Sequence, residues 1–564
     1  MTNQNALLAR IRTSVIGDDR VIDGPFGPRR ITYVDYTASG RALDFIEDYI
    51  RDRVLPYYAN THTETSMTGL QTSHYREQAR ALIRRSVGAD DNYAVIFCGS
   101  GATGAVNRLI DILNLRIPAN LDAKYDLSNA IPADEKPVVF IGPYEHHSNE
   151  LPWRETIAEV IAIREDADGR IDLNHLEEQL GRYQERELLI GSFSAASNVT
   201  GIISDRPAIA ALLHAYGALS FWDYAAAAPY LPIDVDGGSQ SNAVDALFMS
   251  PHKFVGGPGS PGVLVVHKRL MGNRVPARPG GGTVSYVNPV DHVYITDEEH
   301  REEGGTPAII ESVRAGLAYH LKDTVGSAQI VRREESFLRR ALKAWGANPD
   351  IHILGNPDLP RLSIISFVIR YGKQNLHHDF VVAVLNDLFG IQSRGGCSCA
   401  GPYGHRLLHI DMDQSRAFEE SIVDGCNGIK PGWIRVGFNY FFSDTVADYI
   451  IEAVNLTAAH GWKLLPLYTF GPKTGIWRHR DAPNAAPMGL EDLDFYDPAR
   501  SRGETAGEEA LAGYLEEARK ILAQAQGATD RPAVTTGPLT GEAEALRWFP
   551  LPEEAFGRAA RKRT

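Results

Sequence analysis

The stretch 394–401, RGGCSCAG, holds Cys397 and Cys399, two of the four cysteines of the chain. Two thiols separated by one residue could form a metal site, a disulfide bond or a nucleophilic thiolate. A structural zinc site would need a second pair of ligands, and Cys98 and Cys426 do not supply one at a suitable spacing. A C-x-C disulfide would close a very small, strained ring. The spacing therefore predicts no metal site, disfavours a disulfide and leaves a reactive thiol as a hypothesis to be tested against the rest of the chain.

A lysine at the end of an apolar run suggests a second kind of chemistry. Lys253 follows the run 245–250 in the motif Ser250-Pro-His252-Lys253, just before a glycine-rich turn. Most lysines at such positions are surface residues. A lysine in a partly desolvated pocket, however, has a lowered pKa and forms Schiff bases with carbonyl cofactors. The motif alone leaves both interpretations open.

Polar residues follow other apolar runs as well. The turn CGSGATGAVN (98–107) opens a helical pattern, and the free N–H groups of such a helix start can bind a phosphate, although any βα corner has this form. Asp223 either caps a turn or pairs with a cation such as a pyridinium nitrogen. His147 and its neighbour His146 either stack on an aromatic cofactor or lie exposed in a loop. Asn198 is either a hydrogen-bond donor to a ligand or a turn former.

The elements that must position these residues alternate along the chain. Short apolar runs predict buried strands, and segments such as 104–115 and 206–217 predict helices between them. This alternation predicts βαβ units and a mostly parallel sheet in an α/β protein. Ligands of such sheets bind beyond the carboxyl ends of the strands, where the polar residues above would converge. The predicted strands are 93–101, 137–144, 188–194, 218–225, 245–250 and 262–268.

The length of 564 residues exceeds what one hydrophobic core usually supports, so the chain is expected to form several domains. The first 30 residues form a polar arm, followed by a large domain over 31–320. A smaller α+β domain over 321–462 would carry the C-x-C loop. The tail over 463–564 is rich in proline, glycine and charge and would be a partly ordered or disordered appendage, with a helical stretch near 507–526.

The overall composition is that of an ordinary globular protein. The net charge of −14 argues against a surface for nucleic acid. No apolar run is long enough to cross a bilayer, the first residues lack the core of a signal peptide, and the cysteines are few. We therefore expect a cytoplasmic protein with no membrane or nucleic-acid partner.

The order of the motifs resembles the class V aminotransferase family of fold-type I enzymes, which use pyridoxal 5′-phosphate (PLP). The resemblance covers roughly residues 31–455. It includes the opening YVDYTASGRAL (33–43), the segment REEGGTP (301–307) and the loop GGGTV (280–284). It implies an α/β fold with a large PLP-binding domain and a smaller domain. It also implies a homodimer in which the GGGTV loop reaches the phosphate of the neighbouring subunit.

The resemblance assigns a role to each candidate residue. Lys253 would form the Schiff base and move the Cα proton, Asp223 would pair with the pyridine nitrogen, and His147 would stack on the ring. Arg435 in WIRVGFN would bind the carboxylate of an amino-acid substrate, and Asn198 would contact the ring oxygen or the substrate. The other cofactor-binding positions implied by the resemblance are Gly101, Ala102, Thr103, Ala225, Ser250, His252 and Thr283.

The C-x-C loop resembles the R-x-G-H-H-C-A loop of cysteine desulfurases and selenocysteine lyases, and still more the loop of molybdenum cofactor sulfurases. The alignment makes Cys399 the nucleophile that takes up sulfur while cysteine, or a related amino acid, becomes alanine, and leaves Cys397 a bystander. The glycines before Cys399 would let the loop swing toward the substrate. A sulfur-acceptor protein would be a further partner. Two departures concern the site: Ala226 replaces a glutamine, and Cys397 and Ser398 replace two histidines.

Two alternatives remain at this stage. A transaminase, an epimerase or a kynureninase-like hydrolase would share Lys253, Asp223 and Arg435 but would not need Cys399. A catalytically silent scaffold or sulfur-transfer partner would keep the fold without the chemistry. The retained Lys253–Asp223 pair argues against a scaffold, since a degenerate site would be expected to lose its lysine first.

Overall fold

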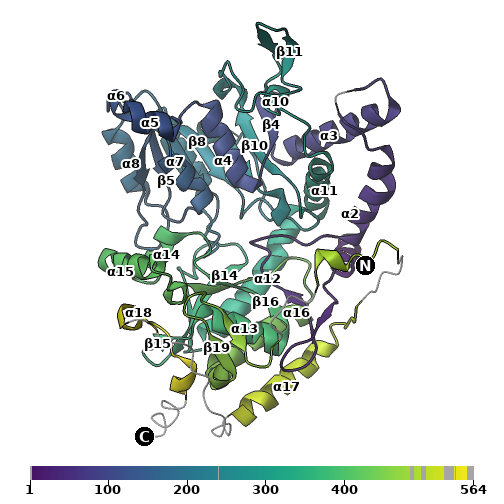
Figure 1. The fold of residues 1–564 in the computed structure, drawn as a ribbon, viewed down its shortest axis with the longest axis vertical. Helices are drawn as coiled ribbons and strands as arrows, with labels where there is room; N and C mark the ends of the chain where they lie inside the picture. The colour runs from purple at the N-terminus through teal and green to yellow at the C-terminus, as the bar shows by residue number, and fades with distance from the viewer. Residues whose placement is uncertain are drawn as a thin grey trace.

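A seven-stranded sheet forms the centre of the upper part of the molecule in Figure 1. The computed structural model describes residues 3–61, 63–238, 240–482, 488–496, 503–525, 539 and 541–555. The strand order is β4-β10-β9-β8-β7-β5-β6, in which the last five strands are parallel and β10 runs antiparallel to both its neighbours. The strands are β4 (Tyr93–Cys98), β5 (Val138–Ile141), β6 (Glu159–Ala162), β7 (Leu189–Ser194), β8 (Leu219–Asp223), β9 (Ala246–Met249) and β10 (Gly262–His267).

Six of these seven strands lie on the six apolar runs predicted from the sequence. Residues of β4, β5, β7 and β9 are buried throughout, which is why their sequences are continuously apolar and do not alternate. The strand that the sequence did not predict, β6, lies at the edge of the sheet and is buried at none of its four residues. Its sequence, EVIA, has three apolar residues but begins with the exposed Glu159, so the segment lacks the fully buried character of the other strands.

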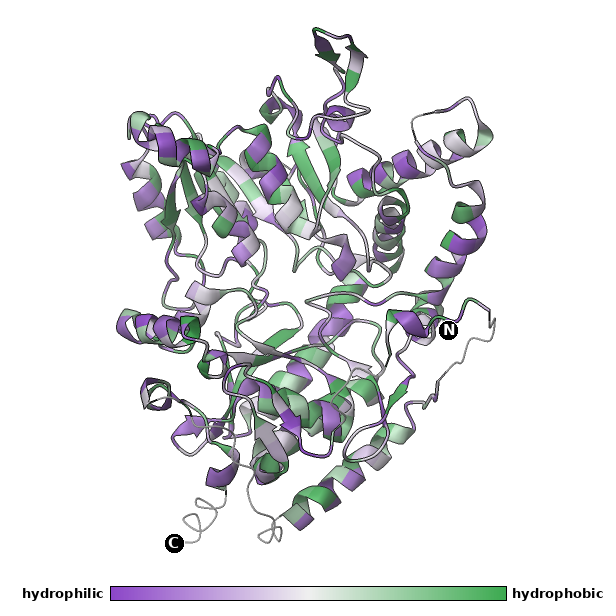
Figure 2. Ribbon diagram, in the orientation of Figure 1, coloured by the Kyte–Doolittle hydropathy of each residue, from purple (hydrophilic) through white to green (hydrophobic). Residues whose placement is uncertain are grey.

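Both faces of the sheet are covered, which confirms the predicted α/β class. Successive residues of one strand enter different cores: Val95 packs in one cluster and Ile96 in the other. The helix α4 (Gly101–Ile112) covers β9 and β10 on one face. The helices α3 (Met67–Ser86) and α11 (Ile309–Val325) pack together in the other core. Figure 2 shows the central strands in the green of hydrophobic residues, with purple on the outer sides of the helices.

The lower part of the molecule in Figure 1 is built on a smaller antiparallel sheet of order β13-β14-β18-β17. Its strands are β13 (Ile351–Ile353), β14 (Ile364–Tyr371), β17 (Arg394–Gly396) and β18 (Trp433–Gly437), with β15 (Gln374–Asn375) paired to β14. The helices α12 (Ser327–Gly346), α13 (His378–Phe389) and α16 (Asp444–His460) complete this part. A large α/β part with a smaller α+β part agrees with the predicted fold class.

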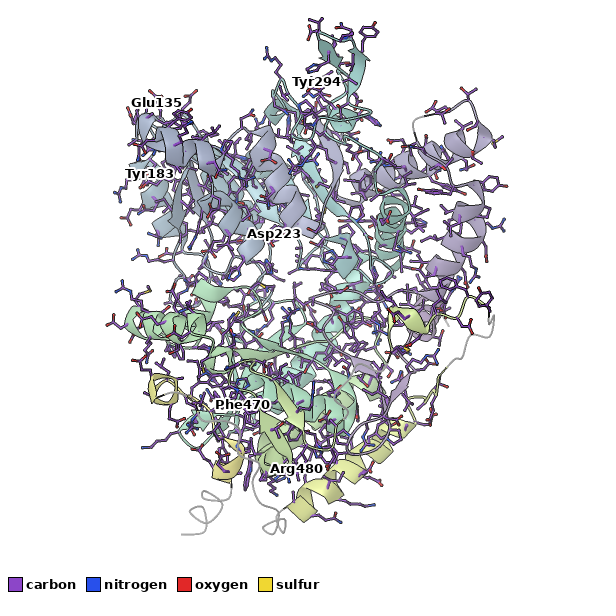
Figure 3. All side chains as sticks on the ribbon, viewed as in Figure 1. Glu135, Tyr183, Asp223, Tyr294, Phe470 and Arg480 are labelled. Carbon is purple, nitrogen blue, oxygen red and sulfur yellow. The ribbon has the colours of Figure 1, made fainter. Side chains whose placement is uncertain are left out.

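Described segments near both ends of the chain join the lower part. A short parallel pairing of β3 (Thr32–Tyr33) with β16 (Ile391–Gln392) draws the segment after the N-terminal helix toward the small sheet. In the tail, α17 (Ala510–Gln524) lies within the predicted helical stretch and packs on α16. Phe470, labelled in the lower part of Figure 3, is buried in the core of this part. No helix among the described residues is long and apolar enough to cross a membrane.

Candidate active site

A cavity of about 200 Å³ lies between the strand ends of the large sheet and the loop that carries Cys399. Asp223, labelled near the middle of the molecule in Figure 3, marks its floor at the end of β8. The cavity brings together most of the residues predicted to form the site, although they are far apart in the chain. Those that line it are Gly101, Ala102, Thr103, Asn198, Asp223, Ala225, Ser250, His252, Lys253, Cys399 and Arg435.

One end of the cavity is suited to an anion. Helix α4 begins there at Gly101, and the side chain of Ser100, at its N-cap position, makes no capping hydrogen bond. The backbone N–H of Ala102 donates to Ser250 Oγ at 2.8 Å, and Thr103 Oγ1 shares a 2.6 Å hydrogen bond with Ser148 Oγ. Hydroxyl groups together with a helix N-terminus form a site for a phosphate group.

Gly101 is essential to the shape of this end, and we expect Gly101→Ala to weaken PLP binding. Its φ of 58° lies in the left-handed region, and a Cβ would lie 2.8 Å from Ser250 Oγ and from the His252 ring. The overlap should weaken PLP binding by about 10- to 100-fold in a fluorescence titration. Gly217→Ala is the matched control, because Gly217 has a φ of 72° and open space around it. Equal affinity in both variants would contradict the anion site.

Lys253 and Asp223 are buried groups of opposite charge in the same cavity. Lys253 ends the short helix η5 (Pro251–Lys253) after β9. Burial lowers the pKa of Lys253 to about 8, against the opposing effect of Asp223. Burial raises the pKa of the Asp223 carboxyl, and the Ala225 N–H donates to it at 2.8 Å. A lysine with a lowered pKa is a nucleophile near neutral pH, and the buried carboxylate calls for a cation beside it.

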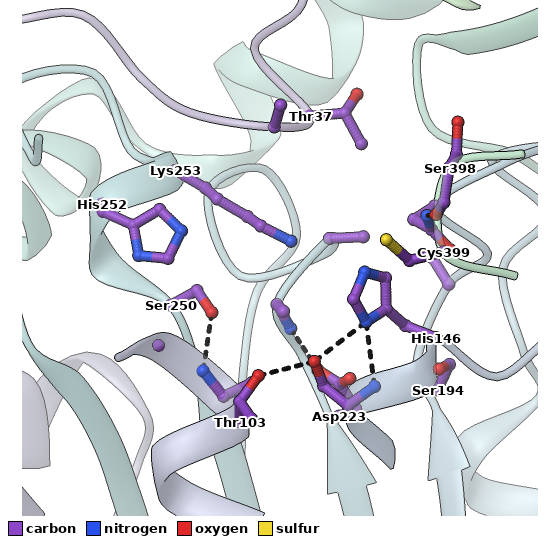
Figure 4. A pocket seen from close by; sticks show the side chains of 18 of the residues that line it. Thr37, Thr103, His146, Ser194, Asp223, Ser250, His252, Lys253, Ser398 and Cys399 are labelled. Carbon is purple, nitrogen blue, oxygen red and sulfur yellow. Dashed lines mark hydrogen bonds between the residues drawn. The ribbon is translucent and has the colours of Figure 1, made fainter. Parts of the chain in front are cut away.

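The histidine in the cavity is His146, and this corrects the prediction for His147. Figure 4 shows the His146 ring between Asp223 and Cys399. The ring is hydrogen-bonded to Ser148. The backbone N–H of Ser148 donates to His146 Nδ1 at 3.1 Å, so the ring proton resides on Nε2. Burial lowers the pKa of His146 to about 3, which keeps the ring neutral. His147 begins the next turn, η3 (His147–Asn149), and does not line the cavity.

Two arginines line the cavity, and one aspartate pairs with both of them. Arg435 on β18 and Arg394 on β17 are direct cross-strand partners. Asp35 lies between them, 2.8 Å from Arg435 and 3.7 Å from Arg394. Two guanidinium groups share a single carboxylate here, which leaves one positive charge unmatched. A second carboxylate, such as that of an amino acid, would balance it.

The thiol of Cys399 faces the same cavity. In Figure 4 its sulfur and the amino group of Lys253 approach from opposite sides. All four cysteines are unpaired, and Cys399 is the exposed one. Burial raises the pKa of Cys98 to about 12, and Cys397 packs partly against the core. Among the four, Cys399 is placed to act as a nucleophile on a ligand in the cavity.

Thr283 lies outside this cavity. It is buried beneath the exposed hairpin of β11 (Val284–Val287) and β12 (His292–Tyr294), at the top of Figure 1, and its hydroxyl donates to the Gly280 carbonyl. Its predicted contact with the phosphate of a neighbouring subunit remains a prediction.

Several lining residues were missed by the sequence reasoning. Thr37 and Ser194 line the cavity, and the buried Glu145 lies behind Ser194, whose hydroxyl donates to it at 2.6 Å. The position of Thr37 in the opening motif YVDYTA was the only available indication. Ala226 also lines the cavity, so the departure from the family's glutamine lies within the site.

The residues present fit PLP, the cofactor implied by the sequence resemblance. The helix start at Gly101 suits its phosphate, Asp223 suits its ring nitrogen and Lys253 suits its aldehyde. The side-chain oxygen of Asn198 is buried without a hydrogen-bond partner. An unpaired buried oxygen facing the cavity is what a missing ligand would leave.

Comparisons with known proteins agree with this arrangement. Among curated proteins, the probable cysteine desulfurase of Halalkalibacterium halodurans is 28% identical over 391 residues, covering 68% of this chain and 87% of the relative. That of Streptomyces coelicolor is 27% identical over 390 residues, covering 68% and 86%.

Solved structures share the fold. The apo cysteine desulfurase of Thermococcus onnurineus has a TM-score of 0.60 at 20% identity, covering 76% of this chain and 95% of that one. The cysteine desulfurase CsdA of Escherichia coli has a TM-score of 0.57 at 20% identity, covering 76% and 94%.

The family model for class V aminotransferases matches residues 32–439, well over half of the chain, which confirms the family predicted from the order of the motifs. The chain belongs to the class V aminotransferase family, whose members are PLP-dependent enzymes.

Proposed function

We propose that this protein is a PLP-dependent cysteine desulfurase, which converts cysteine or a related sulfur or selenium amino acid to alanine. The observation that carries the proposal is the Cys399 thiol in the same cavity as Lys253, Asp223 and Arg435. A transaminase or an epimerase would use the last three residues and would have no need of an exposed thiol there. The two curated relatives described above bear the name of the same activity.

Each group of residues in the cavity would have a separate role in this reaction. The Arg394–Asp35–Arg435 group would bind the substrate carboxylate and so orient the Cα–H bond. Lys253, with its lowered pKa, would take up the Cα proton at Nζ, while PLP, when bound, supplies the electron sink for the resulting carbanion. His146 Nε2 carries a proton inside the cavity. This proton could be donated to the substrate Cβ once the Cβ–S bond has broken.

The sulfur transfer itself is a balanced exchange between two thiols. The Cys399 Sγ attacks the substrate sulfur, an S–S bond forms and the Cβ–S bond breaks, with its electron pair left on Cβ. A proton added to Cβ and the return of the proton to Cα complete alanine. Overall, cysteine and the Cys399 thiol give alanine and a Cys399 persulfide, with no external oxidant. A soft thiolate is the best side-chain nucleophile for this step.

The products distinguish the proposal from its rivals. With L-cysteine, we expect the purified protein with PLP to form alanine in an amount equal to the sulfide that a thiol reductant releases. A transaminase would instead form the keto acid of cysteine and require a keto-acid acceptor. Formation of the keto acid without alanine would overturn desulfuration and leave only the PLP fold. Selenocysteine in the same assay tests the related lyase activity.

We also infer a homodimer, a small amino-acid substrate and a sulfur-acceptor protein. The hairpin of β11 and β12 supports the dimer, because it projects from the body with exposed apolar side chains such as Val290. The exposed position of Cys399 supports transfer to an acceptor. The four unpaired cysteines support a reducing, cytoplasmic location.

A further inference from the structure

Three hydrogen bonds hold the loop that carries Cys399 to the large part of the molecule. The Asn198 Nδ2 donates to the carbonyl oxygen of Ser398 at 2.9 Å, and the backbone N–H of His147 donates to the carbonyl oxygen of Cys399 at 2.8 Å. The third bond runs the other way: the backbone N–H of Gly401 donates to Nε2 of the His147 ring at 3.1 Å. The loop is therefore fixed on both sides of the thiol.

The loop has a backbone conformation that needs such outside support. Ser398 and Cys399 have φ angles of 51° and 55°, both in the left-handed region that residues with a Cβ rarely adopt. Neither residue is a glycine, although Gly396 lies just before them. Two consecutive residues of this kind are unfavourable on their own, so a loop released from its contacts would be expected to relax and move the thiol.

We propose that His147 and Asn198 are positioning residues that hold the Cys399 thiol at a fixed place over the cavity. The thiol would then attack the substrate from a loop that is held in one conformation. The glycines before Cys399 predict a loop that swings toward the substrate. The three hydrogen bonds instead favour a loop held in one position. The catalytic consequence rests on the proposed function, whereas the rigidity of the loop does not.

The two residues act from different sides. Asn198 lines the cavity, and its backbone carbonyl oxygen accepts from Arg435 Nη1 at 3.0 Å, so the residue links the loop to the predicted carboxylate site. His147 lines no part of the main cavity and instead borders an outer depression beside Leu151 and Glu155. A change at His147 therefore loosens the loop and leaves the cavity wall as it is.

The bond to His147 requires a neutral imidazole. Nε2 accepts the Gly401 N–H through a lone pair that the doubly protonated ring lacks. Burial lowers the pKa of His147; the positive Lys430 and Arg154 lower it further, and Glu150 opposes them. Arg116 and Glu155 line the same outer depression as His147, and His146, whose pKa is lowered by burial, stays neutral beside it. A released loop would return His147 to its ordinary pKa of about 6.5. The held loop is therefore fully favoured above that pH and is progressively released as the pH falls below it.

Two variants at His147 test the proposal. His147→Leu removes the acceptor, and His147→Gln offers an amide oxygen at a similar reach. Hydrogen–deuterium exchange of the peptide 397–404, which contains the Gly401 amide, reports release of the loop. We expect exchange of this peptide to rise at least tenfold in His147→Leu and to stay near the wild-type rate in His147→Gln. In cysteine turnover, the leucine variant should lose roughly tenfold in kcat with little change in KM. The visible absorbance of bound PLP should be unchanged in both variants.

The outcomes separate this inference from the proposed function. Faster exchange in His147→Leu in a protein that makes no alanine would support the fixed loop and overturn desulfuration. Unchanged exchange in His147→Leu would overturn the fixed loop whatever the activity. If the leucine variant does not fold, the wild type decides: exchange of 397–404, corrected for the intrinsic pH effect, should rise between pH 7.5 and pH 5.5, and a flat profile would refute the proposal.

Discussion

Lys253→Ala is expected to abolish both the visible absorbance of bound PLP and all turnover. Burial lowers the pKa of Lys253 from 10.5 to about 8, which raises the neutral fraction of its amino group near pH 7 by roughly 300-fold. No other lysine lines the cavity formed by the described residues, so none could replace it as the nucleophile toward the aldehyde. Absorbance spectra after reconstitution with PLP, together with an alanine assay, measure both effects.

A second buried lysine provides the control for this variant. The pKa of Lys322 is likewise lowered to about 8 by burial, but its Nζ donates to the Leu231 carbonyl and does not reach the main cavity. Lys322→Ala removes the same kind of buried group and should keep the PLP absorbance, even if the protein becomes less stable. A Lys253→Ala protein that remained coloured and active would refute the assignment of Lys253.

Cys399→Ser is expected to lower alanine and sulfide formation by at least ~10³-fold while leaving the PLP absorbance intact. A serine hydroxyl has nearly the same size but is not ionised near neutral pH, so it cannot accept the substrate sulfur. The variant keeps the backbone of the loop and the contacts of Lys253 and Asp223. Loss of turnover with a normal spectrum would therefore place the defect in the sulfur transfer step.

Cys397→Ser is the matched control for Cys399→Ser. The two cysteines are separated only by Ser398, but Cys397 packs partly against the core and does not line the cavity. We expect Cys397→Ser to retain most of the activity. A wild-type rate of alanine formation in Cys399→Ser would remove the thiol from the mechanism and favour another PLP reaction.

Much of the fold followed from the sequence because a sheet covered on both faces must be apolar along whole strands. That rule found β4, β5, β7, β8, β9 and β10, and it failed only for the half-exposed edge strand β6. Polar residues at strand ends could be recognised for the same reason: after a buried run, Asp223 and Lys253 stand out as groups that need a partner. The order of such motifs was enough to predict the family.

The tertiary structure decided which neighbouring side chain enters the cavity and which distant residues meet there. His146 and His147 are identical in type, and only the hydrogen bond of His146 Nδ1 to Ser148 and that of His147 Nε2 to Gly401 separate their roles. The ion pair of Asp35 with Arg435 joins residues 400 positions apart. The sequence by itself determined the chemical groups and the strands that carry them, because burial imposes a local pattern on composition. It could not determine these choices, because side-chain direction and long-range pairing depend on contacts that exist only once the chain has folded.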